Sequence, residues 1–202
     1  MNNFKAILFT VICTFLIQTS AKAENFSISS PDFKNGGALS KNNEFSGFGC
    51  AQSLLGPYDI CVSDGNRFEG LNCNGKNIAP TIKWNDPPAK TKSFAITVYD
   101  PDMPTGGGWW HFISYNIPRD VREFNANIIT KGAINITNDS GIKSYMGPCP
   151  PSGAIAHRYV YTVYALDSEL NLPPISTAGI ATYMINRHKI AAASMVATYA
   201  RP

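Results

Sequence analysis

The sequence predicts a mainly β domain that ends in one or two helices. Three stretches have the apolar patterning and the Val, Ile, Tyr and Phe content of strands, at residues 93–99, 112–117 and 158–166. A later stretch, residues 177–199, is rich in Ala, Ile and Met and lacks internal proline, which is typical of helices. No period of 20–50 residues repeats, so a solenoid is excluded.

The N-terminal half contains one further predicted strand and a long loop region. Residues 26–33 alternate apolar and polar side chains before a Gly-Gly pair, and this pattern predicts a first strand. Residues 47–75 are rich in Gly, Asn, Asp and Cys and are predicted to form loops. In the strand at 93–99, the alternation places Phe94, Ile96 and Val98 on one face.

The remaining elements are delimited mainly by proline. Pro101 ends the strand at 93–99, and Pro118 ends the strand at 112–117, because proline cannot continue a central ladder. A short strand is predicted at 134–137. The helical stretch begins after Pro173-Pro174, with Ser176 or Thr177 as its N-cap.

The first 23 residues predict a secretory signal peptide. Lys5 is followed by the apolar run Ala6–Ile17 and then by Ala21-Lys22-Ala23, which has the small-x-small pattern of a cleavage site. We expect cleavage after Ala23 and a single domain over residues 24–202, located in the periplasm or secreted. An uncleaved membrane anchor is the alternative.

Charge and cysteine content restrict the class of protein. The chain has 17 Lys and Arg against 14 Asp and Glu, and two of the basic residues fall in the leader, which leaves a net charge of +1. No basic run remains, so we expect no nucleic-acid partner. No second long apolar segment occurs, so we expect no transmembrane segment after cleavage. An even number of cysteines in an exported chain predicts two disulfides, with three pairings open, among Cys50, Cys61, Cys73 and Cys149.

Two stiff loops each lead to an ionisable residue beside a strand. The first is Asp100-Pro101-Asp102-Met103-Pro104, followed by Trp109-Trp110-His111; the second is Gly147-Pro148-Cys149-Pro150-Pro151, followed by His157-Arg158-Tyr159. Such loops can hold polar groups in a rigid pocket. Asp100 is restricted by Pro101 and suits either a pocket or a turn cap.

The chemistry of these residues suits an anion. A carboxylate near His111 would raise its pKa and favour the imidazolium, which could then bind an anionic oxygen. His157 could act in the same way, and Tyr159 would lie on the same face of its strand as His157 and donate from its hydroxyl. A site for a divalent metal built from Asp100, His111 and His157 is the less favoured alternative.

These motifs resemble the phosphatidylethanolamine-binding protein family, and most closely its bacterial, Raf-kinase-inhibitor-like branch. The resemblance runs from about residue 45 to 201 and rests on Asp100-Pro101-Asp102-x-Pro104 with His111, on His157-Arg158-Tyr159, and on branch patterns at 91–95, 106–111, 116–118 and 147–151. It implies an antiparallel β-sandwich with a pocket at one end. Residues 51–72 look like an insertion, and the longer C-terminal segment that covers the pocket in eukaryotic members has no clear counterpart here.

The resemblance also implies roles for individual residues. It favours the disulfide Cys73–Cys149, because it brings the loop regions around these two cysteines together, and we then expect the pairing Cys50–Cys61, whose cysteines bracket a loop that contains Gly56-Pro57. Trp110 is expected at the pocket lip, with core packing as the alternative. The residues expected to contact a ligand are Asp100, His111, His157, Tyr159, Trp110, Pro101, Gly147 and Pro150, and those expected to support them are Asp102, as a partner of Arg158 or of loop N–H groups, and Pro104, as a turn former.

Three functions are compatible with these patterns. The favoured one is a binding module, without cofactor or metal, for a small anionic ligand such as phosphate or phosphoethanolamine. The second is a regulator or inhibitor that acts through protein contact, with the 50–61 loop as its surface. Hydrolysis has the least support, because the sequence has neither a Gly-x-Ser-x-Gly elbow nor a phosphate-binding P-loop.

Overall fold

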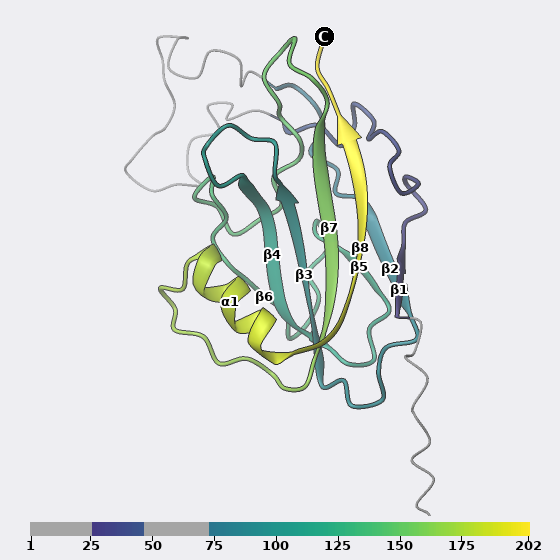
Figure 1. Ribbon diagram of the computed structural model, residues 1–202, viewed down its shortest axis with the longest axis vertical. Coiled ribbons are helices and arrows are strands. Elements are labelled where there is room, and N and C mark those ends of the chain that lie inside the picture. The colour runs from purple at the N-terminus through teal and green to yellow at the C-terminus, as the bar shows by residue number, and fades with distance from the viewer. Residues whose placement is uncertain (1–25, 47–72) are drawn as a thin grey trace, which may run out of the picture.

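The computed structural model describes residues 26–46 and 73–202, which form two antiparallel sheets and one helix (Figure 1). The strands are β1 (Ser27–Ser29), β2 (Thr81–Asn85), β3 (Ser93–Asp100), β4 (Trp109–Pro118), β5 (Glu123–Asn125), β6 (Ile134–Asn135), β7 (His157–Leu166) and β8 (Lys189–Tyr199), and the helix is α1 (Ala178–His188). The predicted leader, the suspected insertion and the Cys50–Cys61 pairing lie outside the described residues. Within them, no helix is long and apolar enough to cross a membrane.

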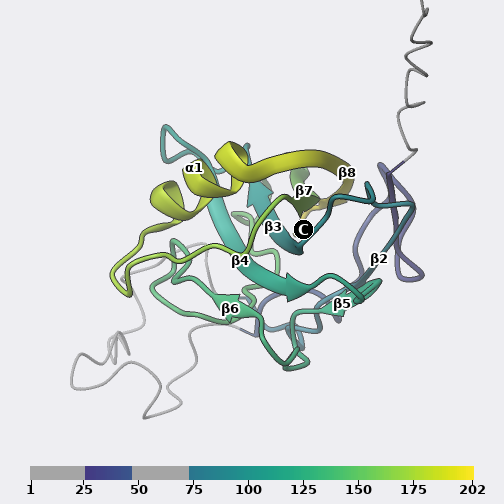
Figure 2. The same cartoon turned by 90° about the horizontal axis from the view of Figure 1, so that it is seen from below.

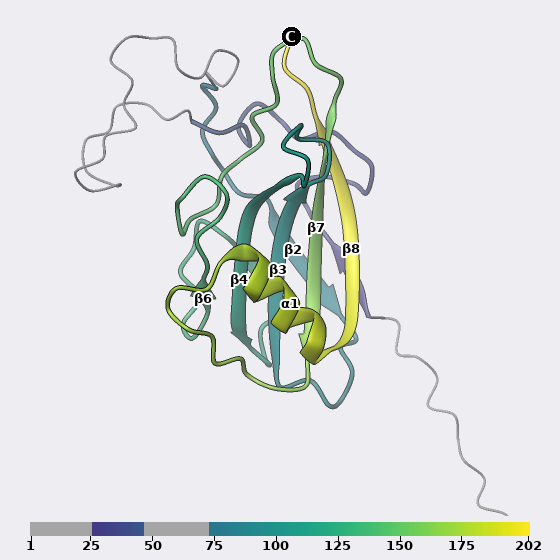
Figure 3. The ribbon, with the colours of Figure 1, turned by 60° about the vertical axis from the view of Figure 1, so that its left-hand side comes forward.

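The larger sheet has five strands in the order β6-β4-β3-β7-β8, and the smaller has three in the order β1-β2-β5. Viewed from below, the smaller sheet lies on one side of the larger and α1 lies on the other (Figure 2). Figure 3 shows α1 crossing the face of β4, β3 and β7. The chain therefore has the predicted mainly β, antiparallel two-sheet architecture.

The central strand β3 is buried on both faces, as its sequence alternation predicts. Phe94, Ile96 and Val98 enter the core between the two sheets, where Phe94 packs edge-on against Trp84 of β2 at 5.1 Å. Ala95 points to the other face and belongs to the apolar cluster under α1. Both faces of β3 are therefore covered, one by a sheet and the other by a helix.

The predicted strands differ from the observed ones mainly at their ends. The predicted strand at 112–117 extends back to Trp109, and the strand at 158–166 includes His157. The first strand is shorter than predicted, at Ser27–Ser29. The strands β2 and β5 were not predicted, because each is short and its pairing is set by the opposite strand rather than by a long local pattern.

The prediction of helix over 177–199 is wrong for its second half. The helix begins after the N-cap Thr177, whose hydroxyl accepts from the N–H of Ile180 at 3.3 Å, and it ends at His188. The following residues form β8, which pairs with β7 over its whole length and turns Met195, Ala197 and Tyr199 inward. Ala and Met favour helices in isolation, but strand pairing with β7 outweighs that preference.

Candidate functional site

The predicted site residues gather at one end of the larger sheet. The register pairs Asp100 with Trp109 and His157 with Tyr199. The end of β3, the starts of β4 and β7 and the end of β8 therefore meet there, at the upper end in Figure 1. This end also receives the two loops that the sequence singles out.

Asp100 caps the turn that follows it and also contacts His157. It is 1% exposed. One oxygen, Oδ1, caps the following turn by accepting from the N–H groups of Asp102 at 2.8 Å and Met103 at 3.1 Å. The other, Oδ2, lies 2.8 Å from Nδ1 of His157. Because a carboxylate oxygen accepts, His157 donates from Nδ1, and its Nε2 is left to face other groups.

His111 occupies a β-bulge in β4. Val98 pairs with Phe112 and Tyr99 pairs with Trp110, so His111 is the extra residue between them. A bulge turns two successive side chains toward one face of a sheet and is common beside functional sites. The His111 ring accordingly meets the Tyr159 ring edge-on at 5.1 Å, and Tyr159 belongs to the core between the sheets.

The ring of His111 is held in one tautomer. Its Nδ1 lies 2.8 Å from the carbonyl oxygen of Met146. Since a carbonyl can only accept, Nδ1 carries the proton, and Nε2 points toward Asp100 Oδ2 at 4.0 Å. In the neutral ring, Nε2 is an acceptor.

The expectation of a charged His111 is not met. Burial lowers the pKa of His111 below its ordinary value, and the Met146 carbonyl and the charge of Asp100 offset this only in part. The carboxylate does favour the imidazolium, as predicted, but the loss of hydration is the larger effect. His111 is therefore neutral at pH 7 in the protein without ligand.

Tyr159 has a buried hydroxyl that makes no hydrogen bond to any residue in the described ranges. Its side chain is 1% exposed. Burial, and then the charge of the nearby Asp100 carboxylate, raise the pKa of Tyr159 far above its ordinary value. The hydroxyl is therefore a protonated donor without a protein acceptor, beside His111.

Asp102 and Arg158 form a two-pronged ion pair next to the site. Asp102 Oδ1 lies 2.7 Å from Arg158 Nη2, Oδ2 lies 3.0 Å from Nε, and Oδ2 also accepts from the Arg158 N–H at 2.8 Å. The hydrogen bond from Arg158 lowers the pKa of Asp102. The Arg158 side chain is 58% exposed, so the pair links the 101–104 turn to β7 from outside. Pro104 lies in the exposed part of that turn.

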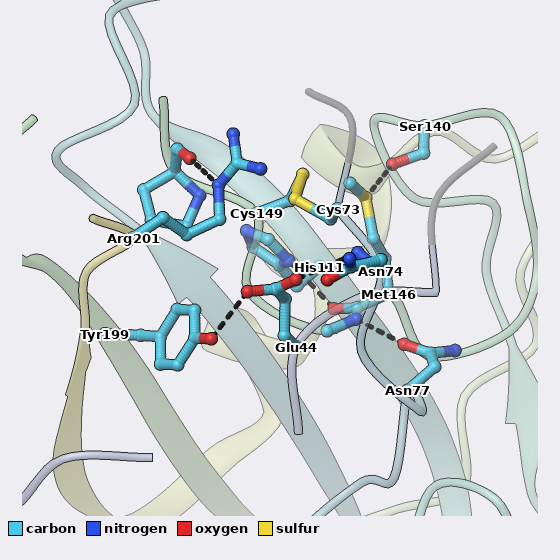
Figure 4. Close-up of a disulfide and its surroundings, with 12 residues drawn as sticks. Glu44, Cys73, Asn74, Asn77, His111, Ser140, Met146, Cys149, Tyr199 and Arg201 are labelled. Atoms are coloured by element: carbon cyan, nitrogen blue, oxygen red, sulfur yellow. Dashed lines mark hydrogen bonds between the residues drawn. A yellow bond between two sulfur atoms is a disulfide. The ribbon is translucent and has the colours of Figure 1, made fainter. Parts of the chain in front are cut away.

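The second loop is fastened by a disulfide between Cys73 and Cys149, the pairing that the resemblance favours (Figure 4). Residues 43–45 run beside this bond. The Phe45 N–H donates to the Pro148 carbonyl at 3.0 Å. A Cβ at Gly147 would come 2.1 Å from the carbonyl oxygen of Asn43, so only glycine fits there.

Gly147 and Pro150, which the resemblance places at the ligand, both have hydrogen-bond partners within the protein. The Gly147 N–H already donates to Asn77 Oδ1 at 2.7 Å. The Pro150 carbonyl accepts from Arg201 Nε at 2.7 Å. These contacts place Gly147 and Pro150 in the frame of the site.

Trp110 and Pro101 lie beside the buried residues in different ways. Because of the bulge, the Trp110 ring faces away from Tyr159 and packs against Tyr99 at 4.4 Å, in the cluster under α1. Its position fits the core-packing alternative. Pro101 is part-buried in the turn that Asp100 caps. The structure thus brings together Asp100, His111, His157 and Tyr159.

Glu44 is a buried acid that sequence reasoning missed. It accepts from Lys41 Nζ at 2.6 Å, from the Asn74 N–H at 2.9 Å and from the Tyr199 hydroxyl at 2.5 Å (Figure 4). Burial acts to raise the pKa of Glu44, but these hydrogen bonds outweigh it and lower the pKa. Two of its partners are far away in sequence, so no local pattern marks it.

In the described part of the chain, no group of three His, Cys, Asp or Glu side chains is arranged to hold a metal ion. Within the predicted set, Nδ1 of His157 is already bonded to Asp100.

Comparison with known proteins identifies relatives of the whole domain. The family model for phosphatidylethanolamine-binding protein matches residues 58–200. The UPF0098 protein YbcL of Escherichia coli is 34% identical over 96% of this chain and 98% of its own length. Its crystal structure, described as a new member of the mammalian PEBP family, superposes with a TM-score of 0.72 over 88% of this chain and 99% of that one.

Two further relatives come from other bacteria. The crystal structure of a phosphatidylethanolamine-binding protein homolog from Chlamydia trachomatis is 26% identical, with a TM-score of 0.68 over 89% of this chain and all of that one. LppC of Mycobacterium tuberculosis, which is named as a lipoprotein, is 34% identical over 64% of this chain and 63% of its own length.

Proposed function

Because the chain belongs to the phosphatidylethanolamine-binding protein family, we propose that it is an exported binding protein for a small anionic ligand that bears a phosphate group. The binding site consists of Tyr159, His111 and His157, with Asp100 behind them. Plain phosphate and phosphoethanolamine share the chemistry that these side chains recognise. The function is binding, and no cofactor or metal takes part.

The Tyr159 hydroxyl carries this proposal. A buried hydroxyl without an acceptor costs about 1–3 kcal/mol, and such groups are rare in folded proteins. Tyr159 is buried, protonated and next to His111. An oxygen of a bound anion would accept its hydrogen bond and remove this cost.

His111 supplies the second contact after a proton is added. Its Nε2 is an acceptor in the neutral ring, and a fully ionised phosphate offers only acceptors. Binding therefore requires one proton, taken up by Nε2 or carried in on a phosphate hydroxyl. In the first case Nε2 donates to an anionic oxygen, and in the second case the phosphate hydroxyl donates to Nε2.

Asp100 orients the site and has little room for a ligand. It already accepts three hydrogen bonds, from the Asp102 and Met103 N–H groups and from His157. A carboxylate offers about four acceptor positions. One position on Oδ2, on the side of His111, is left for an ammonium group such as that of phosphoethanolamine.

Export is the second part of the proposal. The disulfide between Cys73 and Cys149 is of a kind that persists in oxidising compartments. The predicted leader over residues 1–23 and a lipoprotein-named relative support the same location. We place the protein in the periplasm or outside the cell.

The binding proposal is tested by calorimetric titration of the protein without its leader, using phosphoethanolamine and inorganic phosphate. Tyr159→Phe removes the hydroxyl and little else. We expect it to weaken binding at least about tenfold, since a hydrogen bond to a charged group contributes about 1.5–3 kcal/mol.

Tyr161→Phe is the matched control, because Tyr161 lies two residues along β7, is equally buried and has its hydroxyl 3.1 Å from that of Tyr145. It should leave binding unchanged. Equal affinities of the protein and of Tyr159→Phe would refute the site. Heat from phosphoethanolamine but not from phosphate would assign the affinity to the amine and Asp100.

A further inference from the structure

We propose that Asn138 is a positioning residue for His111: its side chain holds the β-bulge and the Met146 loop in the one arrangement that aims Nε2 of His111 into the ligand site. The inference rests on the proposed function only for its consequence in binding. Its structural part concerns the tautomer and orientation of one imidazole, which can be measured without any ligand.

The bulge places the His111 carbonyl outside the ladder between β3 and β4. His111 has no paired residue on β3, because Val98 pairs with Phe112 and Tyr99 with Trp110. Its carbonyl oxygen accepts instead from Asn138 Nδ2 at 2.9 Å and from the Met146 N–H at 3.2 Å. The backbone of the bulge is therefore satisfied by a loop that lies 27 to 35 residues further along the chain.

The Asn138 amide uses its full hydrogen-bonding capacity. Its Nδ2 also donates to the Ser144 carbonyl at 3.1 Å. Its Oδ1 accepts from the N–H groups of Ser140 at 3.0 Å and Ile142 at 3.2 Å. Two donors and two acceptors are thus matched in a side chain that is 5% exposed, and this network admits only one orientation of the amide.

Met146 connects this network to the imidazole. Its N–H donates to the His111 carbonyl, and its own carbonyl accepts from Nδ1–H of the His111 ring. Asn138 fixes Ser144, two residues before Met146, and also fixes the carbonyl to which Met146 donates. Loss of the Asn138 amide therefore removes a restraint from both His111 and the Met146 loop, whose contact sets the tautomer.

The neighbouring Asp139 makes different contacts, which shows that the role of Asn138 is not shared by every polar side chain of this loop. Asp139 Oδ2 accepts from the Trp110 N–H at 2.7 Å, and its own N–H donates to the Trp110 carbonyl at 3.2 Å. Asp139 thus holds the residue whose ring faces α1. The Asn138 side chain instead holds the carbonyl of His111, the residue whose ring enters the site.

The test variant is Asn138→Ser. Serine can still cap the turn through the Ser140 and Ile142 N–H groups, as Ser and Asn both do in loops, but it is too short to reach the His111 carbonyl and adds no charge. The matched control is Asn125→Ser on β5. Asn125 has the same design, with Oδ1 accepting from the Asn127 N–H at 2.9 Å and Nδ2 donating to the Ala79 carbonyl at 2.9 Å.

The first readout is the ¹⁵N spectrum of the imidazoles in the ligand-free protein at pH 7.5. The unaltered protein should show His111 with Nδ1 protonated and Nε2 free. Asn138→Ser should shift this pattern toward a tautomer mixture, and Asn125→Ser should not. A His111 protonated on Nε2 in the unaltered protein would overturn the proposal even where the variant does not fold.

The second readout is affinity for phosphoethanolamine. Asn138→Ser should lose about tenfold, the lower end of what loss of a hydrogen-bond partner behind a metal-binding histidine costs, and Asn125→Ser should lose nothing. An unchanged His111 spectrum in folded Asn138→Ser overturns the positioning role, and so does a changed spectrum with unchanged affinity. If no form binds the ligand, the proposed function fails, and the spectra still decide the role of Asn138.

Discussion

At the scale of single residues, burial has opposite consequences for His111 and Tyr159. The imidazole loses its charge because burial lowers its pKa, whereas the phenol keeps its proton because burial raises its pKa. Each side chain is thereby held in its neutral form. In the candidate site, the Tyr159 hydroxyl is a donor, and Nε2 of His111, at 4.0 Å from the Asp100 carboxylate, is an acceptor.

Tyr159→Phe should increase stability while it weakens binding. In the ligand-free protein the Tyr159 hydroxyl is buried without an acceptor, which is destabilising. Removal of this hydroxyl should therefore raise the free energy of unfolding by about 1 kcal/mol. Tyr161→Phe should lower it, because it leaves the Tyr145 hydroxyl without its partner. Chemical denaturation of both variants measures the difference; a loss of stability in Tyr159→Phe would contradict our account of that hydroxyl.

Anion binding should strengthen as the pH falls. The pKa of His111 is below its ordinary value in the free protein and should rise when an anion faces Nε2, so binding takes up a proton between those two values. One linked proton gives at most about a tenfold gain in affinity per pH unit. Titration with sulfate, whose own charge is constant between pH 6 and 8, isolates the contribution of the protein; an affinity independent of pH would exclude this linkage.

At the scale of elements, the site depends on how loops pack against one another at the end of the larger sheet. Residues 43–45 pass between the two chain segments that the disulfide joins. The backbone of Phe45 is hydrogen-bonded to Pro148 on one side and to Gly75 on the other. The Met146 carbonyl, which fixes the His111 tautomer, belongs to the same loop. The fit of this segment therefore influences the orientation of His111.

Gly147→Ala should destabilise the protein by about 1–3 kcal/mol, the usual cost of overpacking. The new Cβ would lie 2.1 Å from the Asn43 carbonyl and 2.9 Å from the Phe45 nitrogen, and neither backbone atom can turn away. The control is Gly107→Ala, where a Cβ meets nothing within 4 Å. Thermal unfolding of both variants compares them, and a neutral Gly147→Ala would show that the 43–45 segment is free to move.

At the scale of the whole molecule, the disulfide joins residues 76 apart in sequence, and both cysteines are 4% exposed. They pack with Phe45 and Met146 in a small apolar cluster of their own. This bond therefore connects the loop before β2 to the loop before β7. It restrains the unfolded chain over a segment that contains β2 to β6.

Replacement of both Cys73 and Cys149 by alanine should lower the free energy of unfolding by about 4 kcal/mol, from the chain entropy that a bridge of this span removes. The double variant avoids a leftover thiol. Denaturation by urea, under conditions that leave other disulfides intact, measures the loss. A change under about 1 kcal/mol would mean that the bond does not restrain the unfolded chain.

Local sequence patterns were enough to predict the strands with strong alternation, the two loops with their ionisable residues and the family. These features depend on local patterns: Phe94, Ile96 and Val98 at a spacing of two, and Asp100 locked by Pro101. These patterns can be interpreted without knowing which residues pack against them in the folded protein. The mainly β, two-sheet architecture follows from them together with the resemblance.

Features that depend on partners distant in sequence could be identified only from the folded structure. Residues 189–199 became β8 because β7 offered an open edge, which outweighed the helical preference of Ala and Met. His111 is neutral because burial exceeds the attraction of Asp100, and Trp110 faces α1 because of a bulge that no local pattern announces. Each outcome is a balance between a local preference and surroundings assembled from remote parts of the chain, and the balance exists only after folding.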